Sequence, residues 1–326
     1  MEQRTVGCSG LRVSRIGLAT HTWGSQTDSD DAAGQLVAFA EAGGTLVETS
    51  PAYSGGIAQR ILADLFGDVI GRDEFVLSAS AGVVAQIDAP LVELESGVPT
   101  PETTRPTIDA SRRTLLRQLD RTLLELGTDH LDIWTVAAWD PRTPLDEIAA
   151  TLDYAVRSGR VRYAGVSGFG AWQLASLAAI APVVVAQTAY SLLAREAEDD
   201  FVPAARHHGV GVIATAPLSG GILTGKYRNG VPADSRGADE ATAAEIRLRL
   251  DDRATRVVDA LVTAADGLGT SPLAVALAWI RDRAGIASMF VGARDIGQLT
   301  GVMAAETLEL PRAIAAALDD VSARAE

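Results

Sequence analysis

The chain has 326 residues, of which 47% are apolar, and it carries a formal net charge of −14. This length suits one (β/α)8 barrel, which needs about 250 residues before its loops are extended. A strongly acidic surface repels phosphate backbones and anionic lipid, so we expect neither a nucleic-acid partner nor a membrane partner.

We expect no signal peptide at the start of the chain. Residues 1–10 carry charges and lack the apolar stretch of a signal peptide. The longest apolar run, residues 177–186, is interrupted by Pro182 and is far shorter than the roughly 20 residues of a membrane span. The single cysteine, Cys8, excludes an internal disulfide and a cysteine-based metal centre, and we expect no metal. These features favour a cytoplasmic protein.

Short apolar and β-branched runs recur along the chain. Runs of this kind are typical of parallel strands that are buried on both faces. We predict eight such strands, over residues 15–19, 45–47, 75–77, 131–136, 161–166, 183–186, 210–214 and 286–291.

Amphipathic segments with helix-capping residues lie between these runs. Ser29 precedes two aspartates and an apolar pattern that ends at a pair of glycines. Thr143 before Pro144 predicts an N-cap followed by proline at the first helical position. Ser271 before Pro272 repeats this pattern later in the chain. We therefore predict a helix at each of these points.

Strands that alternate with helices indicate a parallel sheet, and eight such units favour closure into a barrel. We predict a single α/β domain over residues 1–326 with the fold of a (β/α)8, or TIM, barrel. The alternative is a doubly wound open sheet. That fold would need a glycine-rich phosphate loop after the first strand, and residues 17–24 do not match its pattern.

Two long segments interrupt the alternation. Residues 83–107 follow the third strand and contain four prolines and an acidic cluster, and residues 228–239 follow the seventh strand. Both lie after strand ends, where the loops of a barrel carry function, so they are candidate rims or lids over a pocket. The alternative for each segment is a surface insertion without function.

The residues at the strand ends include few titratable groups, although functional residues of a barrel lie there. These positions offer the carboxylate of Glu48, the phenol of Tyr53 and the guanidinium of Arg294, with Asp140 slightly further out. No histidine or lysine lies directly at a strand end. His21 and His130 are isolated in the sequence, and we assign them no ligand role. Because acid–base and nucleophilic catalysis usually need a pair of tuned groups, this set favours binding over chemistry.

Motifs in order along nearly the whole chain resemble those of the aldo-keto reductases. The matching segments read VETSPAYSGG at residues 47–56, GVSGF at 165–169, QTAYSLL at 187–193 and PLSGGILTGKY at 217–227. Residues 5–18 are similar to the N-terminal β-hairpin and first strand of that family. The resemblance implies a (β/α)8 barrel preceded by a hairpin. It also implies hydride transfer from a nicotinamide to an aldehyde or ketone.

The resemblance places four catalytic positions on this sequence, and three of them are changed. Family members use a tyrosine as proton donor, a lysine that lowers its pKa, an aspartate that holds the lysine and a histidine that orients the carbonyl. Tyr53 retains the tyrosine and Glu48 replaces the aspartate, whereas Ser80 and Ala137 occupy the lysine and histidine positions. A free phenol has a pKa near 10, and an ionised Glu48 would raise it further. Loss of a positioned acid–base group costs about 100-fold to 10,000-fold in rate.

The resemblance also implies an NADP(H) site that is retained in part. The positions on the nicotinamide side are Ser167, Gln187 and Tyr190. The positions on the phosphate side are Pro217, Leu218, Lys226, Arg236, Arg294 and Gln298. Other contacts are lost, because Gly168 and Ala216 replace an asparagine and a serine, and residues 301–302 replace a glutamate–asparagine pair. We therefore expect the affinity for NADP(H) to be weakened or absent.

Two hypotheses from different classes follow. In the favoured one, the chain has lost most or all NADPH-dependent carbonyl reduction and binds a small molecule in the pocket at the barrel mouth, as a ligand-binding or regulatory pseudoenzyme. In the alternative, it is an active NAD(P)-dependent oxidoreductase of aldehydes or ketones that relies on Tyr53 with a protonated Glu48. The sequence does not determine the oligomeric state.

Overall fold

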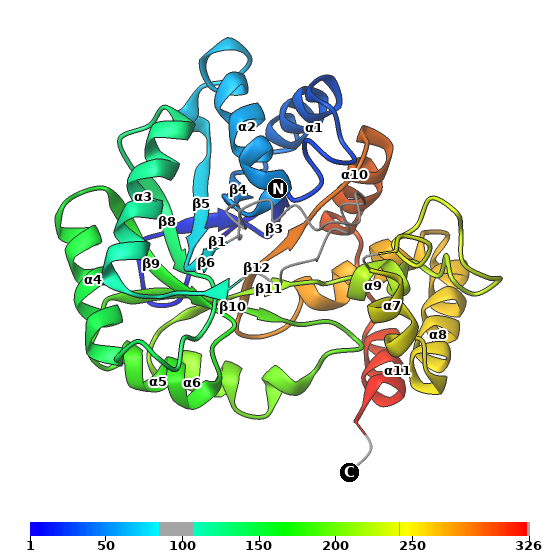
Figure 1. Cartoon of the computed structure of the whole chain (residues 1–326). Coiled ribbons are helices and arrows are strands. Elements are labelled where there is room, and N and C mark those ends of the chain that lie inside the picture. The colour runs from blue at the N-terminus through cyan, green and yellow to red at the C-terminus, as the bar shows by residue number, and fades with distance from the viewer. Residues whose placement is uncertain (85–106, 241, 325–326) are drawn as a thin grey trace, which may run out of the picture.

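The computed structural model describes residues 1–84, 107–240 and 242–324. Within them, eight parallel strands close into a barrel, which confirms the predicted fold and excludes the open sheet (Figure 1). The strands are β3 (Ile16–Ala19), β4 (Leu46–Thr49), β5 (Val76–Ala81), β8 (Leu131–Val136), β9 (Val161–Ser167), β10 (Val183–Ala189), β11 (Gly211–Thr215) and β12 (Ile286–Val291). Each strand follows its predecessor around the barrel, and β12 pairs with β3 to close it.

Helices cover the outside of the barrel (Figure 1). Those that follow the strands are α1 (Ser29–Glu41), α2 (Ile57–Asp68), α3 (Arg112–Leu126), α4 (Leu145–Arg157), α5 (Ala171–Ala178), α6 (Phe201–His207), α9 (Pro272–Arg281) and α10 (Ile296–Met303). The additional helices are α7 (Ala243–Arg249), α8 (Asp252–Leu268) and α11 (Arg312–Ser322). Short 3-10 turns are η1 (Tyr53–Gly56), η2 (Arg72–Glu74), η3 (Glu196–Glu198), η4 (Ser219–Thr224) and η5 (Ala304–Glu306).

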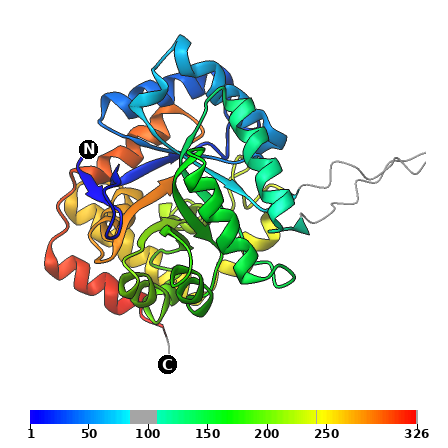
Figure 2. The same cartoon turned by 90° about the vertical axis from the view of Figure 1, so that its left-hand side faces the viewer.

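The predicted N-terminal hairpin is present and covers the amino-terminal end of the barrel. Strands β1 (Gln3–Thr5) and β2 (Arg12–Ser14) pair antiparallel. The backbone N–H of Cys8, in the turn between them, donates to the carbonyl of Gly209 just before β11, at 2.8 Å. Figure 2 shows the hairpin at the end of the molecule opposite to the short strands at residues 83–84 and 107–108. The hairpin therefore leaves the other end of the barrel open for a site.

The two long loops predicted from the sequence differ in how much of each the structure describes. Residues 83–84 and 107–108 form the short antiparallel strands β6 (Val83–Val84) and β7 (Thr107–Ile108). Residues 85–106, which make up most of the first predicted rim, lie outside the described residues. The second loop, residues 228–239, is described and carries Arg236, which reaches the open end of the barrel.

The helix starts follow the sequence in part. Ser271 caps α9, since its hydroxyl accepts a hydrogen bond from the N–H of Ala274 at 3.1 Å. The predicted N-cap at Thr143 is wrong, because α4 begins at Leu145 and its capping position is Pro144. The Thr143 hydroxyl instead donates to the buried carboxylate of Asp140 at 2.8 Å, and this contact removes it from the helix end.

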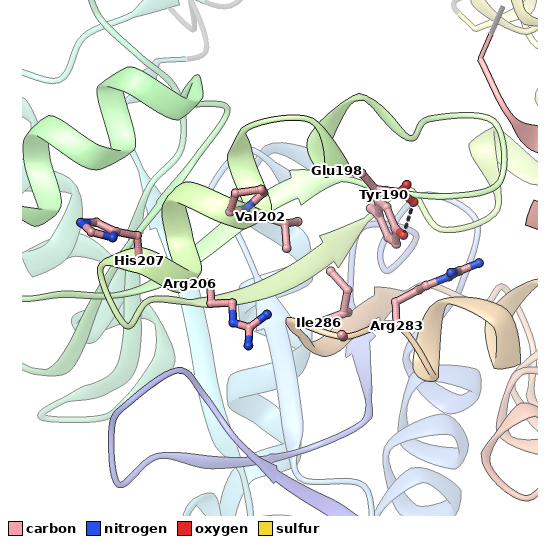
Figure 3. Close-up of a pocket in the computed structure, with 9 residues that line it drawn as sticks. Tyr190, Glu198, Val202, Arg206, His207, Arg283 and Ile286 are labelled. Atoms are coloured by element: carbon pink, nitrogen blue, oxygen red, sulfur yellow. Dashed lines mark hydrogen bonds between the residues drawn. The ribbon is translucent and has the colours of Figure 1, made fainter.

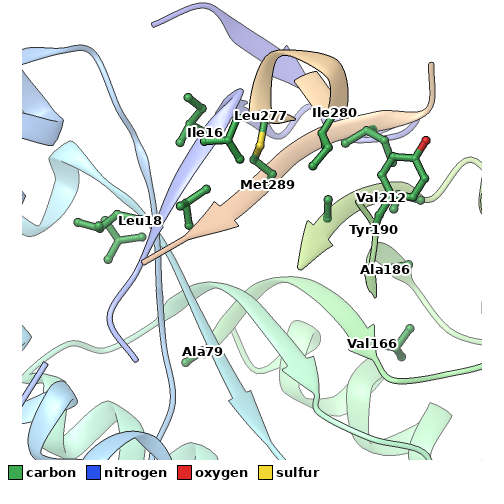
Figure 4. Packing of buried hydrophobic residues seen from close by; sticks show 14 of the residues in the cluster. Ile16, Leu18, Ala79, Val166, Ala186, Tyr190, Val212, Leu277, Ile280 and Met289 are labelled. Carbon is green, nitrogen blue, oxygen red and sulfur yellow. The ribbon is translucent and has the colours of Figure 1, made fainter. Parts of the chain in front are cut away.

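The apolar core has two layers. The outer layer lies between strands and helices, and Figure 4 shows Ile16, Leu277 and Met289 packed together in it. The inner layer fills the barrel and includes side chains from β3, β4, β8, β10, β11 and β12, together with Val6 and Val13 from the hairpin. Inward-facing side chains of a (β/α)8 barrel form a packed interior rather than a pore. The hairpin is thus part of the core and not an appendage.

Within the described ranges, no single helix is long and apolar enough to cross a membrane. Helices α8 and α9 pass the test of length and composition only as a pair, and they are bent by 98° relative to one another. Their buried residues, such as Val257, Leu261 and Leu277, belong to the outer core layer.

Candidate functional site

A cavity of about 780 Å³ lies at the carboxyl ends of the barrel strands. The structure brings together in its lining all but one of the residues that the sequence analysis selected. They are Glu48, Tyr53, Ser80, Ala137, Ser167, Gln187, Pro217, Leu218, Lys226, Arg236, Arg294 and Gln298. The exception is Tyr190. Residues that are far apart in the sequence therefore meet around one space, as expected where parallel strands end together.

Glu48 and Tyr53 form a hydrogen-bonded pair at the floor of this cavity. Glu48 lies in β4, and Tyr53 opens η1, which follows that strand directly. The Tyr53 hydroxyl donates to Oε1 and Oε2 of Glu48 at 2.9 and 3.0 Å. Burial raises the pKa of Glu48 to about 8, although the bond from Tyr53 opposes this change. Burial and the Glu48 carboxylate also raise the pKa of Tyr53 well above its ordinary value.

These directions refine the expectation from sequence that an ionised Glu48 would repel the Tyr53 phenolate. With a pKa of about 8, Glu48 holds its proton at neutral pH, so its charge acts on Tyr53 only in more alkaline solution. At neutral pH the phenol is protonated, since its ordinary pKa is near 10 and burial raises it further. The pair is therefore uncharged at neutral pH and holds two protons on three oxygen atoms.

The positions that the resemblance assigns to lysine and histidine supply no charge. The Ser80 hydroxyl, in β5, donates to the hydroxyl of Ser50 at 3.0 Å. Ala137 follows β8 and contributes only a methyl side chain to the lining. In the part of the chain that the structure describes, no lysine or arginine is hydrogen-bonded to Tyr53 or Glu48. Nothing there lowers the pKa of the phenol.

His21 lines the cavity, and the sequence analysis missed it. It lies two residues beyond β3, and its ring is 6.1 Å from the ring of Tyr53, at an angle of 69°. Its Nε2 atom is 2.6 Å from the guanidinium Nη2 of Arg236, in the 228–239 loop. Burial, and then the charge of Arg236, lowers the pKa of His21 to about 4. The sequence analysis considered only residues directly at the strand ends and therefore did not include His21 in the site.

Cationic side chains line one wall of the cavity, but protein atoms already engage them. Arg236 contacts His21, and Arg294 donates to the backbone carbonyl of Asp234. The ammonium of Lys226 lies over the ring of its neighbour Tyr227, 5.2 Å from the ring centre. The positive charge suits a phosphate or carboxylate, yet a ligand would have to displace or share these contacts.

The nicotinamide-side positions Ser167 and Gln187 are placed as the sequence analysis expects. Ser167 ends β9, and Gln187 lies in β10 with its side chain buried. The amide Nε2 of Gln187 donates to Thr135 Oγ1, in β8, at 3.4 Å. Thr215, at the end of β11, also lines the cavity and was not selected from the sequence.

Tyr190 does not line this cavity, although the sequence analysis selected it as a cofactor contact. Its ring stacks on Trp279 of α9, with centres 5.6 Å apart, and its hydroxyl donates to Glu198 at 2.6 Å. It borders a separate surface pocket of about 670 Å³ beside α6 (Figure 3). Figure 4 places it next to Val212 and Ile280, in the layer between strands and helices. Tyr190 lies three residues after Gln187, and an odd spacing along extended chain reverses the direction of the side chain.

The arrangement can bind and orient a small molecule and can hold a proton, but it lacks the charge that a phenolate needs. Val83, Leu273 and Phe290 give the cavity apolar wall, while Tyr53, His21 and the serines give it polar atoms. In the described part of the chain, no cluster of three or more histidine, cysteine, aspartate or glutamate side chains could hold a metal ion. The geometry therefore suits an uncharged or anionic organic ligand.

Comparisons with known proteins agree with this architecture. Residues 15–323 match the aldo/keto reductase family. The chain is 32% identical to the uncharacterized oxidoreductase YrpG of Bacillus subtilis (strain 168), over 98% of this chain and 96% of that protein. It is 29% identical to a probable voltage-gated potassium channel subunit beta of Oryza sativa subsp. japonica, over 94% and 91%. It is 27% identical to the aldo-keto reductase YhdN of Bacillus subtilis (strain 168), over 92% and 87%.

Proposed function

The chain belongs to the aldo/keto reductase family, and we propose that it is a ligand-binding member in which NADPH-dependent carbonyl reduction is lost or very weak. One observation carries this proposal. The Tyr53 hydroxyl is bonded to the buried carboxyl group of Glu48, and Ser80 stands where a cation would be needed. Proton donation by a phenol at neutral pH requires a lowered pKa, and the pKa of Tyr53 is raised instead.

The residues that would hold NADP(H) fit the cofactor only in part. Lys226, Arg236 and Arg294 would hold its phosphates, and Ser167 with Gln187 would contact the nicotinamide amide. When bound, the cofactor would supply the hydride for carbonyl reduction. Arg236 and Arg294 would first have to leave His21 and the Asp234 carbonyl. The need to break these contacts supports an affinity for NADP(H) below that of an active reductase.

A binding or regulatory role accounts for what the cavity retains. The space is about 780 Å³, within the range of small-molecule sites, and its floor is uncharged at neutral pH. The relative from Oryza sativa is named as a channel subunit rather than as an enzyme. That name supports a role for a protein of this family that does not depend on catalytic turnover.

Titration with NADPH and with NADH is the direct test of the proposal. We expect no saturation below millimolar concentration, because each charge-assisted bond that must be replaced withholds about 1.5–3 kcal/mol from binding. Quenching of tryptophan fluorescence and calorimetry measure the affinity independently. Micromolar binding together with reduction of a simple aldehyde would overturn the proposal. A known reductase of the family in the same assay serves as the positive control.

Restoring the lysine alone is expected to leave carbonyl reduction within a few-fold of the native rate. In Ser80→Lys the new ammonium would lower the pKa of Tyr53. The weakened cofactor site would remain, because residues 301–302 still replace the glutamate–asparagine pair of the family. The measurement is NADPH oxidation with a small aromatic aldehyde, and Ser80→Met is the control for side-chain size. An increase of 100-fold or more in Ser80→Lys would contradict this prediction.

The second candidate function is a slow or altered NAD(P)-dependent oxidoreductase. The observation that favours it is the Glu48 carboxyl group, which keeps its proton up to about pH 8 and lies 2.9 Å from the Tyr53 hydroxyl. Such a pair could pass a proton through Tyr53 to a carbonyl oxygen without a lysine. On this reading, any native turnover disappears in Tyr53→Phe and falls as pH rises through the pKa of Glu48.

A further inference from the structure

The contact between His21 and Arg236 determines which nitrogen of the imidazole carries the proton. An arginine guanidinium only donates hydrogen bonds and does not lose its proton in proteins. The 2.6 Å contact between Arg236 Nη2 and His21 Nε2 therefore requires an unprotonated Nε2. The lowered pKa of His21 agrees with a neutral ring at neutral pH. A neutral imidazole with an unprotonated Nε2 carries its single N–H on Nδ1.

The Nδ1 atom has no hydrogen-bond partner among the described residues, whereas Nε2 is occupied by Arg236. The ring lies directly against the backbone of Gly292, after β12. A Cβ atom at position 292 would be 2.1 Å from Cε1 of His21 and 2.7 Å from its Nδ1. The absence of a side chain at Gly292 thus gives the ring its place, with Arg236 on one side and Tyr53 on another.

We propose that His21, held by Arg236 as the Nδ1–H tautomer, is the donor that orients an oxygen atom of the ligand beside Tyr53. This inference rests on the proposed function, because it takes the cavity to be a ligand site. The ligand class is a small organic molecule that carries a carbonyl or carboxylate oxygen on an apolar body. A free N–H donor in a partly buried site favours an acceptor, and Phe290 and Leu273 supply apolar wall nearby.

Arg236 is a positioning residue in this proposal, and His21 is the residue that touches the ligand. Arg236 enters the cavity from the 228–239 loop, while His21 follows β3. The loop thereby fixes the tautomer of a donor on a neighbouring part of the rim before any ligand binds. Because the tautomer of this donor is already fixed, no free energy of binding is lost to proton rearrangement when the ligand binds.

The tautomer is measured directly by nitrogen-15 NMR of the histidine rings. The chain has four histidines, and comparison with His21→Phe assigns the His21 signals. We expect the Nδ1–H tautomer in the native protein and a mixture with Nε2–H in Arg236→Met. Arg294→Met is the matched control: it removes another cavity arginine, which bonds the Asp234 carbonyl and not His21. An Nε2–H tautomer in the native protein would overturn the proposal.

Ligand contact is measured with benzaldehyde, benzoate and toluene, which share one ring and differ in the acceptor. We expect benzaldehyde or benzoate to shift the His21 Nδ1–H resonance and toluene to leave it unchanged. His21→Phe should weaken binding of the oxygen-bearing probe about 5-fold, the effect of one hydrogen bond. His21→Asn, whose amide replaces an N–H near Nδ1, should stay within about 2-fold of native.

Two results reject the proposal at this stage. One is binding of the probes with no change at Nδ1–H, and the other is failure of all three probes to bind at millimolar concentration. The proposed loss of carbonyl reduction is decided separately, by the NADPH assay. Rapid turnover combined with the expected NMR changes would reject that function and keep the role of His21. Absence of turnover without any change at Nδ1–H would do the reverse.

Discussion

Replacing Glu48 with glutamine is expected to stabilise the protein by up to about 5 kcal/mol at pH 9 and to change its stability little at pH 5. The folded protein holds the Glu48 proton up to about pH 8, whereas an unfolded chain releases it near pH 4.5. Each pKa unit of difference corresponds to about 1.4 kcal/mol. Because Glu48 is almost fully buried, with 7% of its surface exposed, solvent screens little of this effect.

The sign follows from the protons that each state binds. Between pH 4.5 and pH 8 the folded state holds one proton at Glu48 that the unfolded state has lost. Stability from this group is therefore complete below pH 4.5 and is lost as pH rises through the folded pKa. His21 acts oppositely, because its pKa is lowered to about 4, and its contribution is lost as pH falls below its ordinary 6.5. The His21 effect is common to both proteins and cancels in the difference.

The measurement is the free energy of unfolding by denaturant between pH 5 and pH 9, for native protein and Glu48→Gln. Glu309→Gln is the control, since it removes an exposed carboxylate that forms no ion pair with the described residues. We expect the control to follow the native pH profile and Glu48→Gln to lose the decline toward high pH. A native decline that persists in Glu48→Gln would show that Glu48 is ionised in the fold.

The same experiment bears on the choice between the two candidate functions. A Glu48 that keeps its proton at neutral pH leaves an uncharged floor, which suits a binding site and supplies a spare proton for the slow oxidoreductase. An ionised Glu48 would remove that proton source, because Tyr53 could then only donate to the carboxylate. The pH profile therefore shows whether Glu48 keeps the proton on which the second candidate function depends.

The barrel and most of its site could be predicted from the sequence because both depend on local patterns. Apolar runs such as Leu131–Val136 mark buried strands wherever they lie in the chain. Closure then brings the residues after each strand to one end. Glu48, Ser80 and Ser167 meet around the cavity for that reason alone. The family motifs occur in the same order along the chain, and they indicate which residue follows each strand.

The partners of the side chains could not be predicted, because they depend on contacts distant in the sequence. The pair of His21 and Arg236 is separated by 215 positions and forms only when the 228–239 loop folds back toward β3. The engagement of Arg294 by the Asp234 carbonyl has the same origin. Tyr190 is different, since its distance of three residues from Gln187 already indicated the opposite face of the strand. A count of positions from Gln187 would have directed its side chain away from the cavity.

A methyl group at Gly7, in the turn of the N-terminal hairpin, is expected to cost about 3–4 kcal/mol of stability. The φ angle of Gly7 is +55°, a region that costs about 1–2 kcal/mol for a residue with a side chain. An added Cβ would lie 2.2 Å from the Gly209 carbonyl oxygen and 2.6 Å from the Gly211 nitrogen. These atoms belong to the backbone that leads into β11, so no side chain can rotate away to relieve the clash.

Gly10→Ala is the matched control in the same turn. Its Cβ would meet only the Tyr163 hydroxyl, at 4.0 Å, so we expect a change within about 0.5 kcal/mol. Denaturant unfolding gives the two free energies. Exchange of the Cys8 amide proton, whose bond to the Gly209 carbonyl is 2.8 Å, reports on the hairpin itself. Equal stability of Gly7→Ala and Gly10→Ala would contradict the prediction.

The expected cost at Gly7 has an upper limit because the hairpin can detach instead of the barrel distorting. Detachment would expose Val6 and Val13, which are fully buried in the inner core layer, at about 1.5–3 kcal/mol for each side chain. A strained but attached hairpin is therefore favoured whenever the clash costs less than that sum. Fast exchange at Cys8 with the barrel amides still protected would identify detachment, and slow exchange with lowered global stability would identify strain. In both cases the structural change caused by Gly7→Ala would be confined to the amino-terminal end of the barrel, and the cavity at the other end would be unchanged.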